Sequence, residues 1–507
     1  MPIVSIWTRP RTTRPTSEGR GVVQGPAERC GRRNPLNVAG RSTWALLAVG
    51  AGALLVAGCG GGGGKATTTE PDVSGHATAV IVDGYGREPV AGATVLAYDG
   101  AGRPLSSGAL SDATGRVALP EGTTGVCAST AKLPIACRGL LPGRLRVTVP
   151  LYDPAVESPE YGGGPNRTRN VSAVRVPPPS GAPAWTYRGK ALLEFPPVVA
   201  RGTVVLATNR GRVIAFDAAT GAIRWQRRQT TSSYIAASPA ILPADDRVVV
   251  ASMDGRLVAY DLSSGRTAWE FSAGTSEIES SPLVIGETVI IGAWNGRLYA
   301  VSTNTGRIRW TFQADGQIKG SAAQAGGNVI FGDYAGHVYA VRAGDGSLVW
   351  KTAAGKRFYG GPAVSGTTAV IGDVGGAVVA LNTVTGRRLW RHSTGGTYVY
   401  GSPAVAAGAA YIGSYNGMFE ALDLRTGRVR WSFDAGGRIS GSATVVGDTV
   451  YTAVLARHGE HDRTFGLDTA TGRVTWRGDD GRYSPAVAAG RTLYIVGRTT
   501  LYAYPAP

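Results

Sequence analysis

The chain has 507 residues and a formal net charge of +17, with 74 glycines and four cysteines. Its arginines are scattered along the sequence and are not collected in Lys/Arg runs. This distribution argues against a nucleic-acid-binding protein and favours a soluble protein near an anionic envelope surface.

Residues 1–58 are predicted to be a precursor segment, with eight arginines and two glutamates. Its apolar run, 44–58, is shorter than the ~20 residues that a membrane-spanning helix needs. The run ends in Val-Ala-Gly-Cys at 56–59, which resembles the bacterial lipobox and implies lipidation of Cys59. An ordinary signal peptide and an uncleaved anchor are the alternatives. We expect an exported protein, anchored to the outer face of the cytoplasmic membrane, or to an outer membrane if the cell has one.

Residues 59–74, rich in Gly and Thr, are expected to be a flexible tether. Residues 75–176 are expected to form a small Ig- or transthyretin-like β-sandwich and a linker, because alternating strands are broken by Asp-Gly and Gly-rich turns. The phrase Pro-Val-Ala-Gly-Ala-Thr-Val at 89–95 resembles the carboxypeptidase-regulatory, transthyretin-like family, which implies a spacer or adhesion unit. Cys30 lies in the precursor segment and Cys59 is the expected lipidation site, so Cys127 and Cys137 are the remaining cysteines. In an exported protein these two are expected to form a disulfide.

Tryptophan recurs along residues 177–507 at spacings of 40 to 45 residues. Each tryptophan closes a similar phrase, such as GRVIAFDAATGAIRW at 211–225. A period near 40 with short strands and glycine turns is typical of a β-propeller with one four-stranded blade per repeat. The tryptophans expected to pack between blades are Trp185, Trp225, Trp269, Trp310, Trp350, Trp390, Trp431 and Trp476.

The two ends of this region are predicted to share one blade. Each repeat reads as strands A to D, with the tryptophan on strand D. The last phrase, 500–504, is a C strand with no D strand after it, and 180–189 is a D strand with no A–C strands before it. We therefore expect 180–189 to complete the last of eight blades and to leave no open edge. Seven blades is the alternative if this composite blade does not form.

The phrase of a C strand followed by Asp-x-x-Thr-Gly-x-x-x-Trp resembles the pyrroloquinoline-quinone (PQQ) repeat over about 180–507. The enzymatic branch of that family implies PQQ under a vicinal disulfide, with Ca²⁺ and an aspartate base. This region has no cysteine, and we find no acidic constellation that matches those ligands. The resemblance therefore favours the non-catalytic branch typified by the envelope lipoprotein BamB. It implies a monomeric propeller without cofactor that binds an envelope protein, peptide or ligand. The alternatives are a quinoprotein oxidoreductase with PQQ and Ca²⁺, and a cell-wall glycan-binding protein.

The connections from strand D to the next strand A are expected to face one mouth of the central channel. They carry Tyr and Arg, residue types favoured in binding hot spots, and charges of both signs. Two interpretations fit: a peptide or ligand site, or a plug whose residues satisfy one another. The candidate residues are Tyr234, Glu277, Glu279, Lys319, Arg357, Tyr359, Tyr398, Tyr400, Arg438 and Tyr483.

One loop in the Trp476 repeat is irregular and holds two of the five histidines. His458, Glu460, His461 and Asp462 are a candidate divalent metal site, and a solvated polar loop is the other interpretation. No catalytic triad, phosphate loop or nucleotide-binding motif stands out.

Overall fold

The computed structural model describes residues 77–506, except for 85–87, 101–102, 134, 141–142, 172–173, 231–232, 243–244, 397, 456–461 and 484. The precursor segment, Cys59 and the tether therefore lie outside the described residues. Among the described residues, no helix is long and apolar enough to cross a membrane. This part of the chain is all-β apart from the short 3₁₀ helix η1 (Pro154–Val156), as the sequence predicts.

Residues 78–151 form two sheets around one apolar core. The first has the order β4 (Arg116–Ala118), β1 (Thr78–Asp83), β7 (Arg146–Leu151). The second has the order β3 (Ala109–Leu110), β2 (Thr94–Tyr98), β5 (Gly125–Ser129), β6 (Ala136–Gly139). Alternate residues of these strands, among them Ile81, Val95 and Val149, are at most 1% exposed and form the core. The two sheets agree with the predicted sandwich, while the resemblance to the carboxypeptidase-regulatory family stays a prediction.

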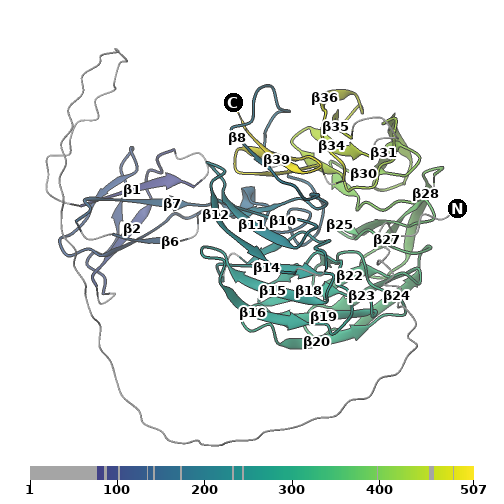
Figure 1. The fold of residues 1–507 in the computed structure, drawn as a ribbon, viewed down its shortest axis with the longest axis horizontal. Helices are drawn as coiled ribbons and strands as arrows, with labels where there is room; N and C mark the ends of the chain where they lie inside the picture. Colours follow the sequence, from purple (N-terminus) through teal and green to yellow (C-terminus); the bar gives the residue numbers. More distant parts are fainter. Residues whose placement is uncertain are drawn as a thin grey trace, which may run out of the picture. The chain divides into compact units, whose positions relative to one another are not determined.

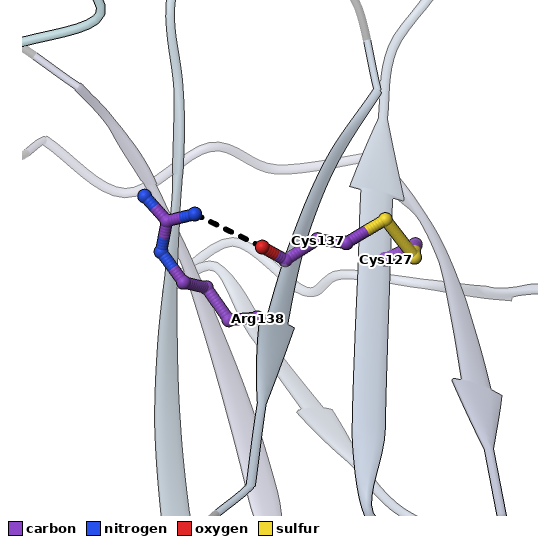
Figure 2. Close-up of a disulfide and its surroundings, with 3 residues drawn as sticks. All are labelled: Cys127, Cys137 and Arg138. Atoms are coloured by element: carbon purple, nitrogen blue, oxygen red, sulfur yellow. Dashed lines mark hydrogen bonds between the residues drawn. A yellow bond between two sulfur atoms is a disulfide. The ribbon is translucent and has the colours of Figure 1, made fainter. Parts of the chain in front are cut away.

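The two cysteines of this sandwich lie opposite each other on adjacent strands. Cys127 of β5 is the register partner of Cys137 of β6, and a disulfide joins them (Figure 2). Next to it, Arg138 Nη1 donates a hydrogen bond of 2.9 Å to the Cys137 carbonyl oxygen. The disulfide therefore ties the edge strand β6 to the body of its sheet.

The described residues from 185 to 505 form eight four-stranded sheets that follow one another around a ring (Figure 1). The first four blades are β9 (Val198–Ala200), β10 (Thr203–Ala207), β11 (Arg212–Asp217), β12 (Ile223–Arg228); β13 (Ala240–Leu242), β14 (Arg247–Ser252), β15 (Arg256–Asp261), β16 (Thr267–Ser272); β17 (Leu283–Ile285), β18 (Thr288–Gly292), β19 (Arg297–Ser302), β20 (Ile308–Gln313); and β21 (Ala323–Ala325), β22 (Asn328–Gly332), β23 (His337–Arg342), β24 (Leu348–Ala353). The other four are β25 (Ala363–Ser365), β26 (Thr368–Gly372), β27 (Ala377–Asn382), β28 (Arg388–Ser393); β29 (Ala404–Ala406), β30 (Ala409–Gly413), β31 (Met418–Asp423), β32 (Val429–Asp434); β33 (Thr444–Val446), β34 (Thr449–Val454), β35 (Arg463–Asp468), β36 (Val474–Gly478); and β37 (Ala486–Ala489), β38 (Thr492–Val496), β39 (Thr500–Pro505), β8 (Trp185–Arg188).

The last blade is composite, as predicted. Strand β8 pairs antiparallel with β39, and Trp185 is the register partner of Ala503 (Figure 1). Its indole ring lies 5.9 Å from Phe216 of the first blade and 5.8 Å from Tyr494 of the last, measured between ring centroids. Because both ends of the repeat region meet in one sheet, the ring closes, and β39 is paired with β8 instead of being left as an edge strand.

Recurring tryptophans join seven of the eight blades to the blade that follows. In the first blade, Trp225 lies opposite Ala215 in the strand register, and its Nε1 donates a 2.8 Å hydrogen bond to the Leu262 carbonyl of the second blade. In every blade an alanine or glycine lies opposite the tryptophan in the strand register, and its small size makes room for the indole in the same sheet. Equivalent bonds, each to a carbonyl of the following blade, are made by Trp185, Trp269, Trp310, Trp350, Trp390 and Trp431.

The inner strands of the blades are covered by residues 156–171, which we call the channel segment. Seven of the inner strands each use the amide of their central residue to bond to it: Val199 to the Ser158 carbonyl, Ile241 to Pro159, Val284 to the Glu160 carboxylate, Gln324 to Pro165, Val364 to Asn166, Val405 to Thr168 and Val445 to Arg169, at 2.7–3.1 Å. The Ser158 hydroxyl reaches the eighth inner strand at the Ala488 carbonyl, at 2.7 Å. The segment thus satisfies backbone groups that a bare inner edge would expose.

This arrangement differs from the sequence prediction, which placed the channel segment within the sandwich and linker of 75–176. Arg167 and Arg169 of the channel segment are 1% and 2% exposed, with φ of 56° and 52°. Arg167 donates to the carbonyls of Ala322 and Pro282 at 3.1 and 2.7 Å, and lies 3.4 Å from the Glu160 carboxylate. The Pro and Gly content of this stretch indicated a connection between domains. Nothing in the local sequence shows that the segment bonds to eight distant strands.

Candidate functional site

The mouth of the channel is built from two sets of loops. The D-to-A connections supply one set, and the turns between strands B and C supply the other. The Trp294 amide donates to the Glu277 carbonyl at 3.0 Å, and the Tyr415 amide donates to Tyr398 at 3.1 Å. Because these bonds recur from blade to blade, the two sets of side chains lie at the same mouth.

Alternation within the D-to-A connections directs side chains into this mouth. Ile278, Phe358 and Val399 are fully buried at the middle of their connections. The residues that follow them, Glu279, Tyr359 and Tyr400, are half-buried and point to the other side of the chain. The connections therefore behave as short extended strands whose buried residue fixes the direction of its neighbours.

Glu279 is the centre of one half of the mouth. Its two carboxylate oxygens accept hydrogen bonds from the Tyr359 hydroxyl and, at 3.1 Å, from Trp294 Nε1. Burial raises the pKa of Glu279, and the charge of Lys319 opposes that rise. The Lys319 ammonium lies 3.6 Å from the centroid of the Trp294 ring and 4.5 Å from that of Tyr334, in cation–π contact with both.

Tyrosines form the other half of the mouth. The ring centroids of Tyr359 and Tyr400 are 5.1 Å apart in an edge-to-face contact. Tyr400 stacks on Tyr398 at 5.4 Å and meets Tyr415 edge-on at 5.0 Å. These geometries are favourable for aromatic pairs, so each ring holds the next in place. Together with the other half they form what we call the mouth cluster: Glu279, Trp294, Lys319, Tyr334, Tyr359, Tyr398, Tyr400 and Tyr415.

The structure brings most of the candidate residues to this mouth. Arg357 and Arg438 are exposed, and their guanidinium carbons lie 6.0 and 5.6 Å from the rings of Tyr334 and Tyr415. Tyr483 contacts its neighbour Arg482, whose guanidinium carbon is 5.7 Å from the ring. Two further candidates contribute backbone bonds to the B–C turns, Tyr234 to Met253 and Glu277 to Trp294.

Four residues of the mouth were missed by the sequence reasoning. Trp294, Tyr334 and Tyr415 occupy the second position of B–C turns that each end in glycine, at 293–296, 333–336 and 414–417. This recurring aromatic was visible in the sequence. Glu194 was not, because it lies outside the repeat. Burial, with repulsion from Glu279, raises the pKa of Glu194 to about 7 against the attraction of Arg482.

The metal-site candidate falls largely outside the described residues, which leave out His458, Glu460 and His461. Asp462 is described, and its carboxylate accepts a 2.9 Å hydrogen bond from Arg482. Within the described part of the chain, no group of three or more His, Cys, Asp or Glu side chains is placed to hold a metal ion.

The repeat region was compared with known families and structures. The family model described as outer membrane protein assembly factor BamB matches residues 167–352, 334–479 and 395–506. The chain belongs to this PQQ-repeat family. The comparison with curated proteins gave no match.

Solved structures with the BamB-type fold include both an assembly factor and dehydrogenases. BamB from Moraxella catarrhalis is 17% identical, with a TM-score of 0.52 over 64% of this chain and 99% of that one. A europium-containing methanol dehydrogenase is 14% identical, with a TM-score of 0.58 over 68% and 90%. Quinohemoprotein alcohol dehydrogenase ADHIIG from Pseudomonas putida HK5 is 13% identical, with a TM-score of 0.57 over 69% and 80%. At these identities the likeness shows the fold alone, and a fold does not decide between binding and catalysis.

Proposed function

We propose that the chain is a non-catalytic, lipid-anchored envelope protein whose mouth cluster binds another extracytoplasmic protein or peptide. The observation that carries this proposal is the mouth cluster itself. Its aromatic rings contact one another in a fixed arrangement, yet remain half-buried and open to a partner. Rigid Tyr and Trp side chains with neighbouring Arg give a large contact area with little loss of side-chain entropy on binding.

The acidic groups at the mouth fit this role better than that of a quinoprotein site. Ca²⁺ takes six to eight oxygen ligands. Both oxygens of Glu279 already accept hydrogen bonds from the aromatic side chains around it. The described residues offer no group of three acidic or histidine ligands for a metal. The described residues therefore do not fit PQQ with Ca²⁺.

The channel segment supports the same conclusion from the inside of the ring. Its buried arginines and Tyr161 occupy the space next to the inner strands, and the Tyr161 hydroxyl is bonded to Ser442 Oγ at 2.8 Å. A partner would therefore meet the mouth as a surface and would not enter the channel. We further propose export and lipidation at Cys59, which palmitate labelling of the chain and of Cys59→Ser would test.

Site-specific photocrosslinking tests the binding role. The photoreactive residue p-benzoylphenylalanine is placed at Tyr400, in the mouth, and separately at Ile308, which is 53% exposed on the outer strand β20. We expect a discrete protein adduct from Tyr400 in intact cells and none from Ile308. Equal labelling from both sites, or none from either, would contradict the proposal. Retention of the chain on purified cell-wall glycan, lost in Tyr400→Ala, would instead assign the mouth to a saccharide.

A PQQ titration tests the enzymatic alternative. Full-length protein is titrated with PQQ, with and without Ca²⁺, while tryptophan fluorescence and dye-linked alcohol oxidation are followed. Trp294→Phe serves as the control that separates quenching at the mouth from quenching between blades. We expect no saturable quenching and no turnover. Saturable quenching with turnover, both altered in Trp294→Phe, would replace the binding proposal by an oxidoreductase.

A further inference from the structure

A basic pocket lies at the seam where the ring closes, apart from the mouth cluster. It has a volume of about 250 Å³ and is lined by Lys190, Leu192, Asn209, Arg210, Arg482, Arg498 and Thr499. These residues come from the connection after β8, the B–C turns of the first and last blades, and the D-to-A connection before the last blade. The pocket therefore exists only because the two ends of the repeat region meet there.

Backbone hydrogen bonds hold the walls of this pocket together. The connection after β8 donates from Gly189 to the Thr499 carbonyl at 2.8 Å and from Leu193 to the Arg498 carbonyl at 2.9 Å. Its Leu192 carbonyl accepts from the Asn209 amide at 3.1 Å. One connection thus links the turns of the first and last blades, so the backbone of the pocket walls is held in place before any ligand arrives.

A carboxylate behind the pocket fixes the turn that carries Arg498. Asp480 accepts hydrogen bonds from the Arg498 amide at 2.7 Å and from the Tyr502 hydroxyl at 3.1 Å. Its oxygens are directed to the backbone of the turn, and Asp480 does not line the pocket. The acid therefore positions the backbone of the turn that carries Arg498, and the Arg498 side chain lines the pocket.

The side chains that line the pocket do not balance one another's charge, although Glu194, on the connection that carries Lys190, attracts Arg482. Four of the seven lining residues are cationic and none is acidic. Elsewhere on the surface arginines commonly have a carboxylate partner, as in the 2.9 Å pair of Arg224 with Asp217. Of the four pocket cations only Arg482 has such a pair in the described part of the chain, with Asp462. Lys190, Arg210 and Arg498 are exposed, so water reduces their mutual repulsion, and a bound anion would lower it further.

The side-chain amide of Asn209, which lines the pocket, also lacks a hydrogen-bond partner for its oxygen among the described residues. That oxygen is buried. Leaving a buried amide oxygen without a hydrogen-bond donor is unfavourable. Because this oxygen makes no hydrogen bond, turning the Asn209 amide by about 180° breaks none at the oxygen. Asn209 could therefore turn its NH₂ group toward a negatively charged ligand.

We propose that this pocket binds a multiply charged oxyanion, of the phosphate or polycarboxylate type. The planar guanidinium groups of Arg210 and Arg498 suit two oxygens of such a group, and Lys190 adds a point charge. The site lies on the same face as the mouth cluster but shares no residue with it. It goes beyond the proposed function, because oxyanion binding here requires neither a protein partner nor the tyrosines.

Isothermal titration of the full chain with inorganic pyrophosphate, at low ionic strength, tests the site. The test variant is Arg210→Gln with Arg498→Gln. The matched control is Arg307→Gln with Arg428→Gln, which removes the same charge from two exposed turns between strands C and D. We expect the test variant to bind at least about tenfold more weakly, since each charge-assisted hydrogen bond contributes about that factor or more. The control should bind as the wild type does.

Two further arms separate the outcomes. Citrate in place of pyrophosphate distinguishes a polycarboxylate site from a phosphate site. Protection of Arg210 and Arg498, but not Arg307, from phenylglyoxal in the unmutated chain gives a readout that needs no variant. The proposal is overturned if the wild type shows no saturable binding of either anion, or if the control variant weakens binding as much as the test variant. Photocrosslinking at Tyr400 is unaffected by either result, so the two proposals fail separately.

Discussion

Removing Arg167 from the channel segment should destabilise the propeller strongly. Its side chain is 2% exposed and the Glu160 side chain is 4% exposed, so the pair is shielded from water. Replacing Arg167 by Met keeps an apolar stem of similar length but leaves the carbonyls of Ala322 and Pro282 without a donor. Glu160 then loses its counter-charge. Burial already raises the pKa of Glu160, so it would take up a proton and recover part of the loss.

The expected size of this effect follows from these contacts. Breaking a buried ion pair by removing one partner costs about 3–5 kcal/mol. We therefore expect Arg167→Met to lower the free energy of unfolding by about that amount. The matched control is Arg175→Met, because Arg175 is 84% exposed and lies 3.9 Å from Asp448, which is equally exposed. An exposed pair contributes about 0–1 kcal/mol, so the control should unfold close to the wild type.

Urea unfolding followed by tryptophan fluorescence measures this difference, because the repeat tryptophans lie between blades and report on the ring. Adding Glu160→Gln to Arg167→Met should recover part of the lost stability, since a neutral amide replaces the unpaired acid. An Arg167→Met protein as stable as Arg175→Met would refute our account of the channel segment as a structural part of the ring.

Three further perturbations have defined outcomes. Gly221→Ala should cost about 1–3 kcal/mol in urea unfolding, because a Cβ there would lie 2.6 Å from the Trp185 ring at a φ of +71°, whereas Gly344→Ala, in open space, should be neutral. Because the pKa of Glu194 is raised from 4.5 to about 7, the wild type should lose up to about 3 kcal/mol of stability as pH rises through that range. Glu194→Gln should remove that loss, and an unchanged pH profile in the variant would contradict it. Replacing both cysteines of the sandwich disulfide by serine should lower the free energy of unfolding of the sandwich by about 2–5 kcal/mol and so lower its thermal midpoint. The unfolding transition followed by tryptophan fluorescence should not change.

The ring could be predicted from the sequence because its signals are local. Each tryptophan phrase specifies its own strand, turn and packing residue within about fifteen positions, and the seven complete copies are in phase. The composite blade was predictable for the same reason, since a D strand without A–C strands and a C strand without a D strand can complete each other. Strand β8 pairs with β39 as that argument requires.

The channel segment could not be predicted because its structure depends on distant partners. Residues 156–171 have no repeat and no strand-like alternation. Their hydrogen bonds go to inner strands that are separated by up to about 330 residues in sequence, as in the bond from Ser158 to Ala488. From the sequence alone, Arg167 and Arg169 cannot be distinguished from surface arginines, because the strands that bury them lie far away in the chain.

The mouth of the channel could be predicted from the sequence only in part. Its D-to-A residues were predicted from their position in the repeat, because the repeat fixes which loops share a face. The tyrosine contacts were not, since ring distances such as the 5.1 Å between Tyr359 and Tyr400 depend on how far each blade turns from the last. The basic pocket depends on the seam alone, where Lys190 and Arg210 meet Arg498 from the far end of the chain.

The channel segment also restricts where a partner can act. Inside the channel, the backbone groups of the inner strands could bind an added chain, and here residues 156–171 already bond to them in all eight blades. Main-chain pairing in the channel is therefore taken by the protein's own segment. What the described mouth leaves for a partner is side chains, namely the rings of the mouth cluster and the cations of the seam pocket. Recognition on this face must then depend on aromatic contact and charge, which is why Tyr400 and Arg210 are the positions at which the two proposals are most directly tested.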